Sequence, residues 1–106
     1  MSRLLDEYLN YLRVEARLSP HTVESYARDI AHYMDRTGLC DGSAVSSVKR
    51  EDILSHLAYL REKGLSAVSL RRHLSSIKSF HRFLLREGLS DADPASDFQS
   101  PRIERR

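Results

Sequence analysis

The stretch Ser66–Gly88, SAVSLRRHLSSIKSFHRFLLREG, carries the strongest pattern in the chain. On a helical wheel at about 100° per residue, its apolar side chains gather on one side, at the spacing of a core-facing stripe. They are Leu70, Leu74, Ile77, Phe80, Leu84 and Leu85. Basic and hydroxyl side chains fill a separate arc of about 120° that contains no acid. They are Arg71, Arg72, Ser75, Lys78, Ser79, Arg82 and Arg86. The stretch therefore predicts a helix with one core face and one cationic face.

The cationic face predicts a polyanionic partner. Arginine, lysine and serine without carboxylates bind phosphates and read base edges, whereas a face kept for solubility usually mixes both signs. Residues 61–88 hold seven basic and two acidic side chains, a local excess of five, although the whole chain has a net charge of only +2. Local fields matter more than this sum. A helical protein-interaction module, whose basic face meets an acidic partner protein, is the alternative.

Three further helices are predicted before this one. Ser2 can cap a helix that ends near Leu18 and buries Leu5, Tyr8, Leu9 and Leu12. Ser19 followed by Pro20 is a helix start signal, and Gly38 is a stop signal. The helix between them buries Val23, Tyr26, Ala27, Ile30, Tyr33 and Met34. A third helix over 49–63 places Ile53, Leu54, Leu57 and Leu60 inward and ends at Gly64.

The segments around these helices are shorter. Residues 39–47 are expected to form a loop. Ser66 can cap the fourth helix and Gly88 can end it. Asp93 followed by Pro94 repeats the cap-and-proline signal and predicts a short fifth helical turn through Phe98. The chain is therefore expected to be all-α, a four-helix bundle with a short fifth helix.

The second predicted helix carries a weaker basic face. Opposite its apolar stripe lie His21, Ser25, Arg28, His32 and Arg36. Two such helices packed side by side would form a surface wide enough to straddle a groove of double-stranded DNA.

Composition narrows the function classes. A chain of 106 residues is one domain, and its one cysteine, Cys40, excludes an internal disulfide. No apolar run is long enough to span a membrane, and the first residues lack the order of a signal peptide, so a cytoplasmic location is expected. His21 and His32 are too far apart to chelate one ion, and no glycine-rich phosphate loop is present. No metal, cofactor or small-molecule ligand is expected.

Several aromatic and histidine side chains are expected to serve packing. Tyr8, Tyr11, Tyr33 and Tyr59 are interpreted as packing residues, and Tyr26 as a core residue whose hydroxyl reaches a polar partner. His73 and His81 lie near the apolar stripe and are expected to be buried or at its boundary. Phe83 falls near the cationic face and is expected to pack against residues 93–98 or to contact a neighbouring subunit.

Three segments together resemble a known family. LSPHTVESYARDI (18–30), GLSAVSLRRHLSSIKSFHRFLLREG (64–88) and DPASDFQSPR (93–102) resemble the amino-terminal, SAM-like core-binding domain of tyrosine recombinases, the phage integrase family, in particular the Xer type of bacteria. The matching positions in the second helix are Thr22, Tyr26 and the nearby acid Asp29. Those in the fourth helix are Ser69, Arg72, Leu74, Ser75 and Lys78.

The resemblance implies a DNA-binding domain that is not itself an enzyme. Residues 1–98 would be the core-binding domain, and 99–106 the start of a linker to an absent catalytic domain that carries the tyrosine nucleophile. The whole protein would act in DNA recombination and integration and in chromosome-dimer resolution. Its partners would be a double-stranded recombination half-site and other recombinase subunits in a synaptic tetramer, which the first helix helps to hold together.

The resemblance also implies which residues face the DNA. In the family the second and fourth helices face the major groove. The residues implied in the second helix are Thr22, Ser25 and Arg28. Those implied in the fourth are Ser69, Arg72, Ser75, Ser76 and Ser79, and the cationic arc adds Arg71, Lys78 and Arg82 as DNA-binding residues. Val68 stands where some members of the family have a basic residue.

Overall fold

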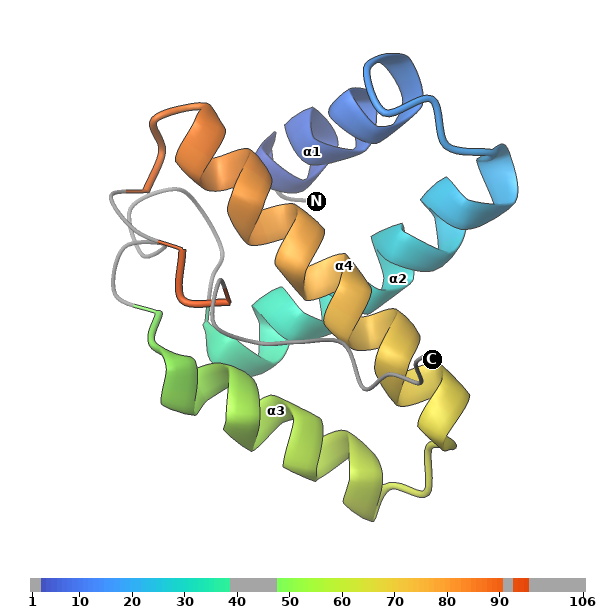
Figure 1. The fold of residues 1–106 in the computed structure, drawn as a ribbon, viewed down its shortest axis with the longest axis vertical. Helices are drawn as coiled ribbons and strands as arrows, with labels where there is room; N and C mark the ends of the chain where they lie inside the picture. The colour runs from blue at the N-terminus through green and yellow to red at the C-terminus, as the bar shows by residue number, and fades with distance from the viewer. Residues whose placement is uncertain (1–2, 39–47, 91–92, 96–106) are drawn as a thin grey trace, which may run out of the picture.

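The computed structural model describes residues 3–38, 48–90 and 93–95 of the chain. Within these residues it contains no strand and four helices: α1 (Arg3–Val14), α2 (Pro20–Thr37), α3 (Arg50–Glu62) and α4 (Ala67–Arg86). In Figure 1, α4 crosses in front of α2, with α1 along the upper edge and α3 along the lower edge. The all-α prediction and the order of four helices are confirmed.

The helix ends follow local signals in the sequence. The Ser19 side chain accepts a hydrogen bond of 3.2 Å from the Thr22 N–H and caps α2. The Ser66 side chain does the same for Ser69 at 3.2 Å and caps α4. Gly38 follows α2 with φ of 78°, a left-handed conformation that glycine adopts without a steric penalty.

The first helix is shorter than predicted, since it ends at Val14 instead of near Leu18. The chain leaves the helical path because Arg17 is left-handed, with φ of 56°. The Leu18 N–H then donates to the Leu12 carbonyl at 3.1 Å, which satisfies one of the last carbonyls of α1. This turn brings Ser19 into place as the cap of α2.

The core lies between α4 and the other three helices. The Tyr8 ring of α1 meets Phe80 of α4 edge-on, with centroids 5.1 Å apart. The Tyr33 hydroxyl of α2 lies 2.7 Å from Nε2 of His81 on α4. Both tyrosines are fully buried, and burial raises the pKa of each phenol, so both stay protonated. Their predicted packing role and the burial of His73 and His81 are confirmed.

Three apolar side chains do not lie where the helical wheel placed them. Phe83 is buried between Tyr8 and Tyr11 of α1, with centroid distances of 5.5 and 5.2 Å. This contact with α1 was not predicted, and the expected contacts with residues 93–98 or with a neighbouring subunit stay predictions. Leu54 and Leu85 were expected in the core, yet they are 47% and 43% exposed. On α4, Phe83 packs against α1 and His81 contacts Tyr33 of α2, so the buried side of this helix is wider than one apolar stripe.

The segment after α4 is described only at residues 93–95, which form a turn. The Ala95 N–H donates to the Asp93 side chain at 2.9 Å, and Ala95 is buried. Asp93 thus accepts a hydrogen bond within this turn, but the described residues 93–95 form no fifth helix. The rest of the predicted fifth helical turn, the linker over 99–106 and the loop over 39–47 lie outside the described residues. No helix in the described part of the chain is both long and apolar enough to cross a membrane.

Candidate nucleic-acid interface

The outer side of α4 carries a straight line of polar side chains, here called the α4 row. Its members are Arg71, Ser75, Lys78 and Arg82, spaced four, three and four residues apart, so they follow one another along the helix axis. Arg82 is exposed and the other three are half-buried. None of the three cations forms an ion pair with a residue that the structure describes. Their charges therefore face solvent without an internal partner in this part of the chain.

A hollow joins the start of α2 to α4. Its lining residues are His21, Thr22, Ser25 and Tyr26 of α2 and Arg72 of α4. Thr22, Ser25 and Arg72, all predicted from the sequence to face DNA, are thus brought together. Arg28 lies one turn further along α2, exposed, in a loose pair with Glu24 at 4.0 Å. The hollow presents hydroxyl donors and a guanidinium to one space, a combination suited to an anionic or acceptor-rich ligand.

Arg72 is held by a buried carboxylate. Its Nε donates to Oδ2 of Asp29 and its Nη2 donates to Oδ1, each at 2.9 Å. The Asp29 side chain is only 3% exposed, while that of Arg72 is 42% exposed. The hydrogen bonds that Arg72 donates to Asp29 raise the pKa of Arg72, which keeps the guanidinium charged. This two-point geometry fixes the plane of the guanidinium.

Two more side chains of α4 complete the surroundings of Asp29. The Ser76 Oγ lies 3.0 Å from Oδ2 of Asp29 and 3.0 Å from the Arg72 carbonyl. Nε2 of His73 lies 3.3 Å from Oδ1. Burial lowers the pKa of His73, which favours the neutral ring beside Asp29. A buried carboxylate requires such donors around it.

The prediction that Ser76 faces a DNA groove is wrong. Ser76 is fully buried, because its hydroxyl is needed beside Asp29. Ser79 is half-buried, and its Oγ accepts a hydrogen bond of 3.0 Å from the Tyr8 hydroxyl. Ser69 is half-buried in the first turn of α4, where it takes part in the Ser66 cap. Of the predicted serines of α4, Ser75 lies in the α4 row.

The basic face predicted for α2 is narrower in the structure. His32 turns toward α3, where its ring lies 5.5 Å from His56 and 5.8 Å from Tyr59. The Arg36 guanidinium stacks 3.9 Å from the centre of the Tyr59 ring. His32 is thus half-buried against α3, whereas Arg36 stays exposed while it contacts Tyr59. The polar groups that line the hollow are near the start of α2.

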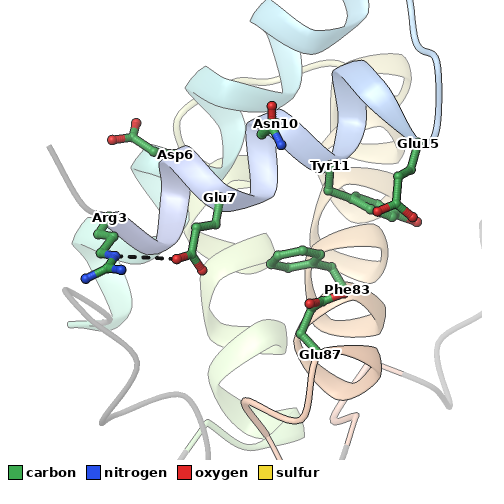
Figure 2. Close-up of a pocket in the computed structure, with 8 residues that line it drawn as sticks. All are labelled: Arg3, Asp6, Glu7, Asn10, Tyr11, Glu15, Phe83 and Glu87. Atoms are coloured by element: carbon green, nitrogen blue, oxygen red, sulfur yellow. Dashed lines mark ion pairs between the residues drawn. The ribbon is translucent and has the colours of Figure 1, made fainter.

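The far end of α4 is acidic. Arg86 pairs with Glu15 of α1 at 2.6 Å, so this member of the cationic arc is neutralised. Figure 2 shows the adjoining hollow between α1 and α4. Its lining residues are Arg3, Asp6, Glu7, Asn10, Tyr11, Glu15, Phe83 and Glu87, and Arg3 is already paired with Glu7 at 3.5 Å. Four carboxylates at this end disfavour a polyanion, so the candidate interface is confined to the start of α2 and the α4 row.

Asp29 is the residue whose role sequence reasoning missed. Its position one turn after Ser25 placed it at the margin of the α2 basic face, and the family pattern marked it only as a nearby acid. The signal that could have revealed this role is an acid on the basic face of α2, together with an arginine and a serine four residues apart on α4. No three His, Cys, Asp or Glu side chains of the described residues gather closely enough to hold a metal ion.

Comparison with known proteins identifies the family of this domain. The sequence profile described as phage integrase, N-terminal SAM-like domain matches residues 5–88. The chain belongs to this family. The resemblance expected from the sequence is thereby confirmed, and in this integrase-type domain α2 and α4 correspond to the helices that carried the resemblance.

Xer tyrosine recombinases are similar to the domain over almost its whole length. Tyrosine recombinase XerD of Oceanobacillus iheyensis is 35% identical over 103 residues, 96% of this chain and 35% of the relative. XerD of Halalkalibacterium halodurans is 38% identical over 103 residues, 96% of this chain and 34% of the relative. XerC of Pelotomaculum thermopropionicum is 38% identical over 107 residues, 96% of this chain and 35% of the relative. The integrase-type domain thus spans about a third of the length of these relatives. No solved structure matches it significantly.

Proposed function

We propose that this chain is the DNA-binding domain of a site-specific tyrosine recombinase and that it grips a recombination half-site through α2 and α4. The observation that carries the proposal is the α4 row beside the hydroxyl-lined hollow of α2, in a domain of the integrase family. DNA binding uses small hydroxyl groups and cations such as these, which have no ion-pair partner among the described residues.

The geometry suggests a division of roles on this surface. A major groove admits one helix, and the elements beside that helix then contact the phosphate walls. Arg71, Lys78 and Arg82 stand outward along α4 and would neutralise phosphates. Thr22 and Ser25 are small enough to allow the backbone of α2 to approach base edges.

The remaining predicted contacts have supporting roles. Arg28 is exposed beyond the hollow and would reach a phosphate of the same groove. Ser75 lies in the α4 row, while Ser69 and Ser79 are half-buried beside it and would contact DNA only at its margin. Ser76 has no part in the proposal.

The proposal extends to the longer protein of which such a domain is part. That protein would exchange DNA strands with a tyrosine nucleophile carried outside residues 5–88, act with other recombinase subunits in a synaptic tetramer and work on cytoplasmic DNA. Its roles would be DNA integration and chromosome-dimer resolution. Tyr8 and Tyr33 are unsuited to nucleophilic attack, because both phenols are buried in the core and their raised pKa keeps them protonated.

A salt series tests the proposal. Fluorescence anisotropy of the 106-residue chain with a labelled duplex should give an affinity that falls steeply with salt. The expected logarithmic slope is about −3 if three or four phosphates are neutralised, at about −0.9 per phosphate. A slope near zero, or no binding to any duplex, would refute the proposal, and a shallow slope with an acidic protein partner would favour the interaction module instead.

A matched pair of variants locates the contact. Lys78→Gln should weaken binding and reduce the slope by about one charge, because Lys78 lies in the α4 row. Lys49→Gln removes the same charge from an exposed residue just before α3, outside the candidate DNA interface of α2 and α4. It should change the affinity less than Lys78→Gln. Equal effects would mean that only the total charge matters.

A further inference from the structure

We infer that Asp29 is a positioning residue for DNA binding: from its buried place on α2 it fixes the Arg72 guanidinium so that the free edge of that group faces the DNA. The inference rests on the proposed function and deepens it. It assigns a role in binding to an acid that cannot itself contact a polyanion favourably.

The first step is a count of donors on Arg72. A guanidinium has five N–H groups in a fixed fork. The Nε–H and one Nη2–H point to Asp29, each with a distance of 2.9 Å. The two N–H groups of Nη1 and the second of Nη2 remain. One N–H of Nη1 and this second N–H of Nη2 form the end of the fork, the edge that matches a pair of acceptors such as O6 and N7 of guanine or two phosphate oxygens.

The second step is the place of that edge. Arg72 is 42% exposed and lines the hollow with Thr22, Ser25 and Tyr26. Asp29 takes the Nε–Nη2 edge of the guanidinium, so the end of the fork is the edge left for a ligand in the hollow. A ligand that enters from the DNA side therefore meets the end-on edge of the guanidinium together with the hydroxyl groups of α2.

The third step is the rigidity of the support. Asp29 is held by Ser76 at 3.0 Å and by His73 at 3.3 Å, and it is 3% exposed. These contacts come from α4, whereas Asp29 belongs to α2. The carboxylate cannot rotate without breaking several hydrogen bonds, so Arg72 is ordered before DNA arrives. Ordering a long side chain during binding weakens affinity by about two- to twelve-fold, the equivalent of ~0.5–1.5 kcal/mol at ~1.4 kcal/mol per tenfold.

The direction in which one substitution changes DNA affinity distinguishes this positioning role from a simple effect of charge. Asp29→Asn removes an acid beside a DNA-binding surface, so charge alone predicts tighter binding to a duplex. Positioning predicts the opposite, weaker binding by about two- to twelve-fold, because the amide N–H₂ would oppose the Arg72 donors and release the guanidinium. Asp35→Asn is the matched control, with the same change at an exposed position of α2. It should leave binding unchanged or slightly tighter.

A double variant tests whether Asp29 acts through Arg72. With a random-sequence duplex as the probe, Asp29→Asn should add no further loss once Arg72 has been changed to alanine. An equal loss from Asp29→Asn in both backgrounds would overturn the inference, since Asp29 would then act independently of the guanidinium. Circular dichroism melts show which variants are folded. If Asp29→Asn does not fold, Ser76→Ala removes only one donor to the carboxylate and should give a smaller loss of the same sign.

A measurement without DNA tests the positioning inference separately from the proposed DNA-binding function. In the free chain, the Nε–Hε proton of Arg72 should exchange with water more slowly in NMR spectra than that of the exposed Arg13, which forms no ion pair within the described residues. Slow exchange in a chain that binds no duplex would overturn the proposed function alone. Exchange as fast as that of Arg13, in a chain that binds DNA, would overturn the positioning inference alone.

Discussion

Acidification is expected to destabilise the domain through two buried histidines. His56 and His81 are 1% and 0% exposed. Burial lowers the pKa of each ring from 6.5 to about 4. In the unfolded chain both rings return to about 6.5, so the unfolded state binds more protons at every pH between these values. Stability contributed by the neutral rings is therefore complete above about pH 6.5 and is lost as the pH falls toward 4.

The size of the effect follows from the two pKa values. At pH 5 the unfolded rings are protonated and the folded rings are not. This pH lies about 1.5 units below the unfolded pKa, and each unit corresponds to ~1.36 kcal/mol. The stabilisation from each neutral histidine therefore falls by about 2 kcal/mol, and that from the pair by about 4 kcal/mol. The total free energy of unfolding of a domain of this size is about 5–15 kcal/mol. The midpoint of thermal unfolding should fall by about 15–30 °C between pH 7 and pH 5, at about 4–8 °C per kcal/mol.

The assay is a set of thermal and urea unfolding curves, followed by far-ultraviolet circular dichroism at several pH values. His56→Leu isolates one histidine from the carboxylates that also titrate. Neither ring nitrogen of His56 has a hydrogen-bond partner within the described residues, so leucine removes no hydrogen bond there. The variant should be at least as stable as the parent chain at neutral pH, and it should lose about 2 kcal/mol less on acidification to pH 5.

One outcome of comparing His56→Leu with the parent chain would contradict this expectation. If His56→Leu and the parent chain lose the same free energy of unfolding between pH 7 and pH 5, His56 is not held neutral by burial. The control is His21→Leu, since His21 is exposed at the start of α2. That change should leave the pH dependence of stability unaltered.

Four other outcomes are expected. Arg72→Ala should reduce discrimination between a selected half-site and a scrambled duplex by about 1–3 kcal/mol through loss of a bidentate guanine contact; equal weakening on both duplexes would make Arg72 a phosphate anchor only. Arg82→Ala should weaken both duplexes alike and lower the salt slope by about one charge, as paired titrations would show. Phe83→Ala should cost about 3–5 kcal/mol in urea unfolding, because the ring is buried between Tyr8 and Tyr11, and a loss below about 1 kcal/mol would contradict that packing. A suicide half-site substrate should yield no covalent adduct on a denaturing gel, and an adduct would reveal a nucleophile in this chain.

Local signals in the sequence predicted the order and most ends of the helices. Ser19, Gly38 and Ser66 act at the positions where they stand, because capping depends on the few residues around each helix end. The end of α1 was predicted too late. Arg17 adopts a left-handed conformation there, which its side chain gives no reason to expect.

The side-chain environment was less predictable, because it depends on contacts between residues distant in the sequence. A wheel gives the direction of Phe83 or Leu85 on α4, but it does not reveal which helix covers that turn. The pairing of Asp29 with Arg72 joins positions 43 residues apart. Its effect on the site is large: it removes Ser76 from the surface and changes Arg72 from a free cation into a held one.

The acidic hollow shown in Figure 2 has a consequence for how the chain would meet DNA. Arg71 near the start of α4 and Glu87 just beyond its end are separated by roughly 24 Å, at ~1.5 Å per helical residue. This distance exceeds a Debye length of about 8 Å, so the two ends of α4 interact with the negative field of DNA independently. The basic end is attracted and the acidic end is repelled. The result is a torque that turns an approaching chain before contact, with α2 and the start of α4 leading. Neutralising the carboxylates of the hollow should therefore slow productive encounter through misorientation, even though no bound contact is lost.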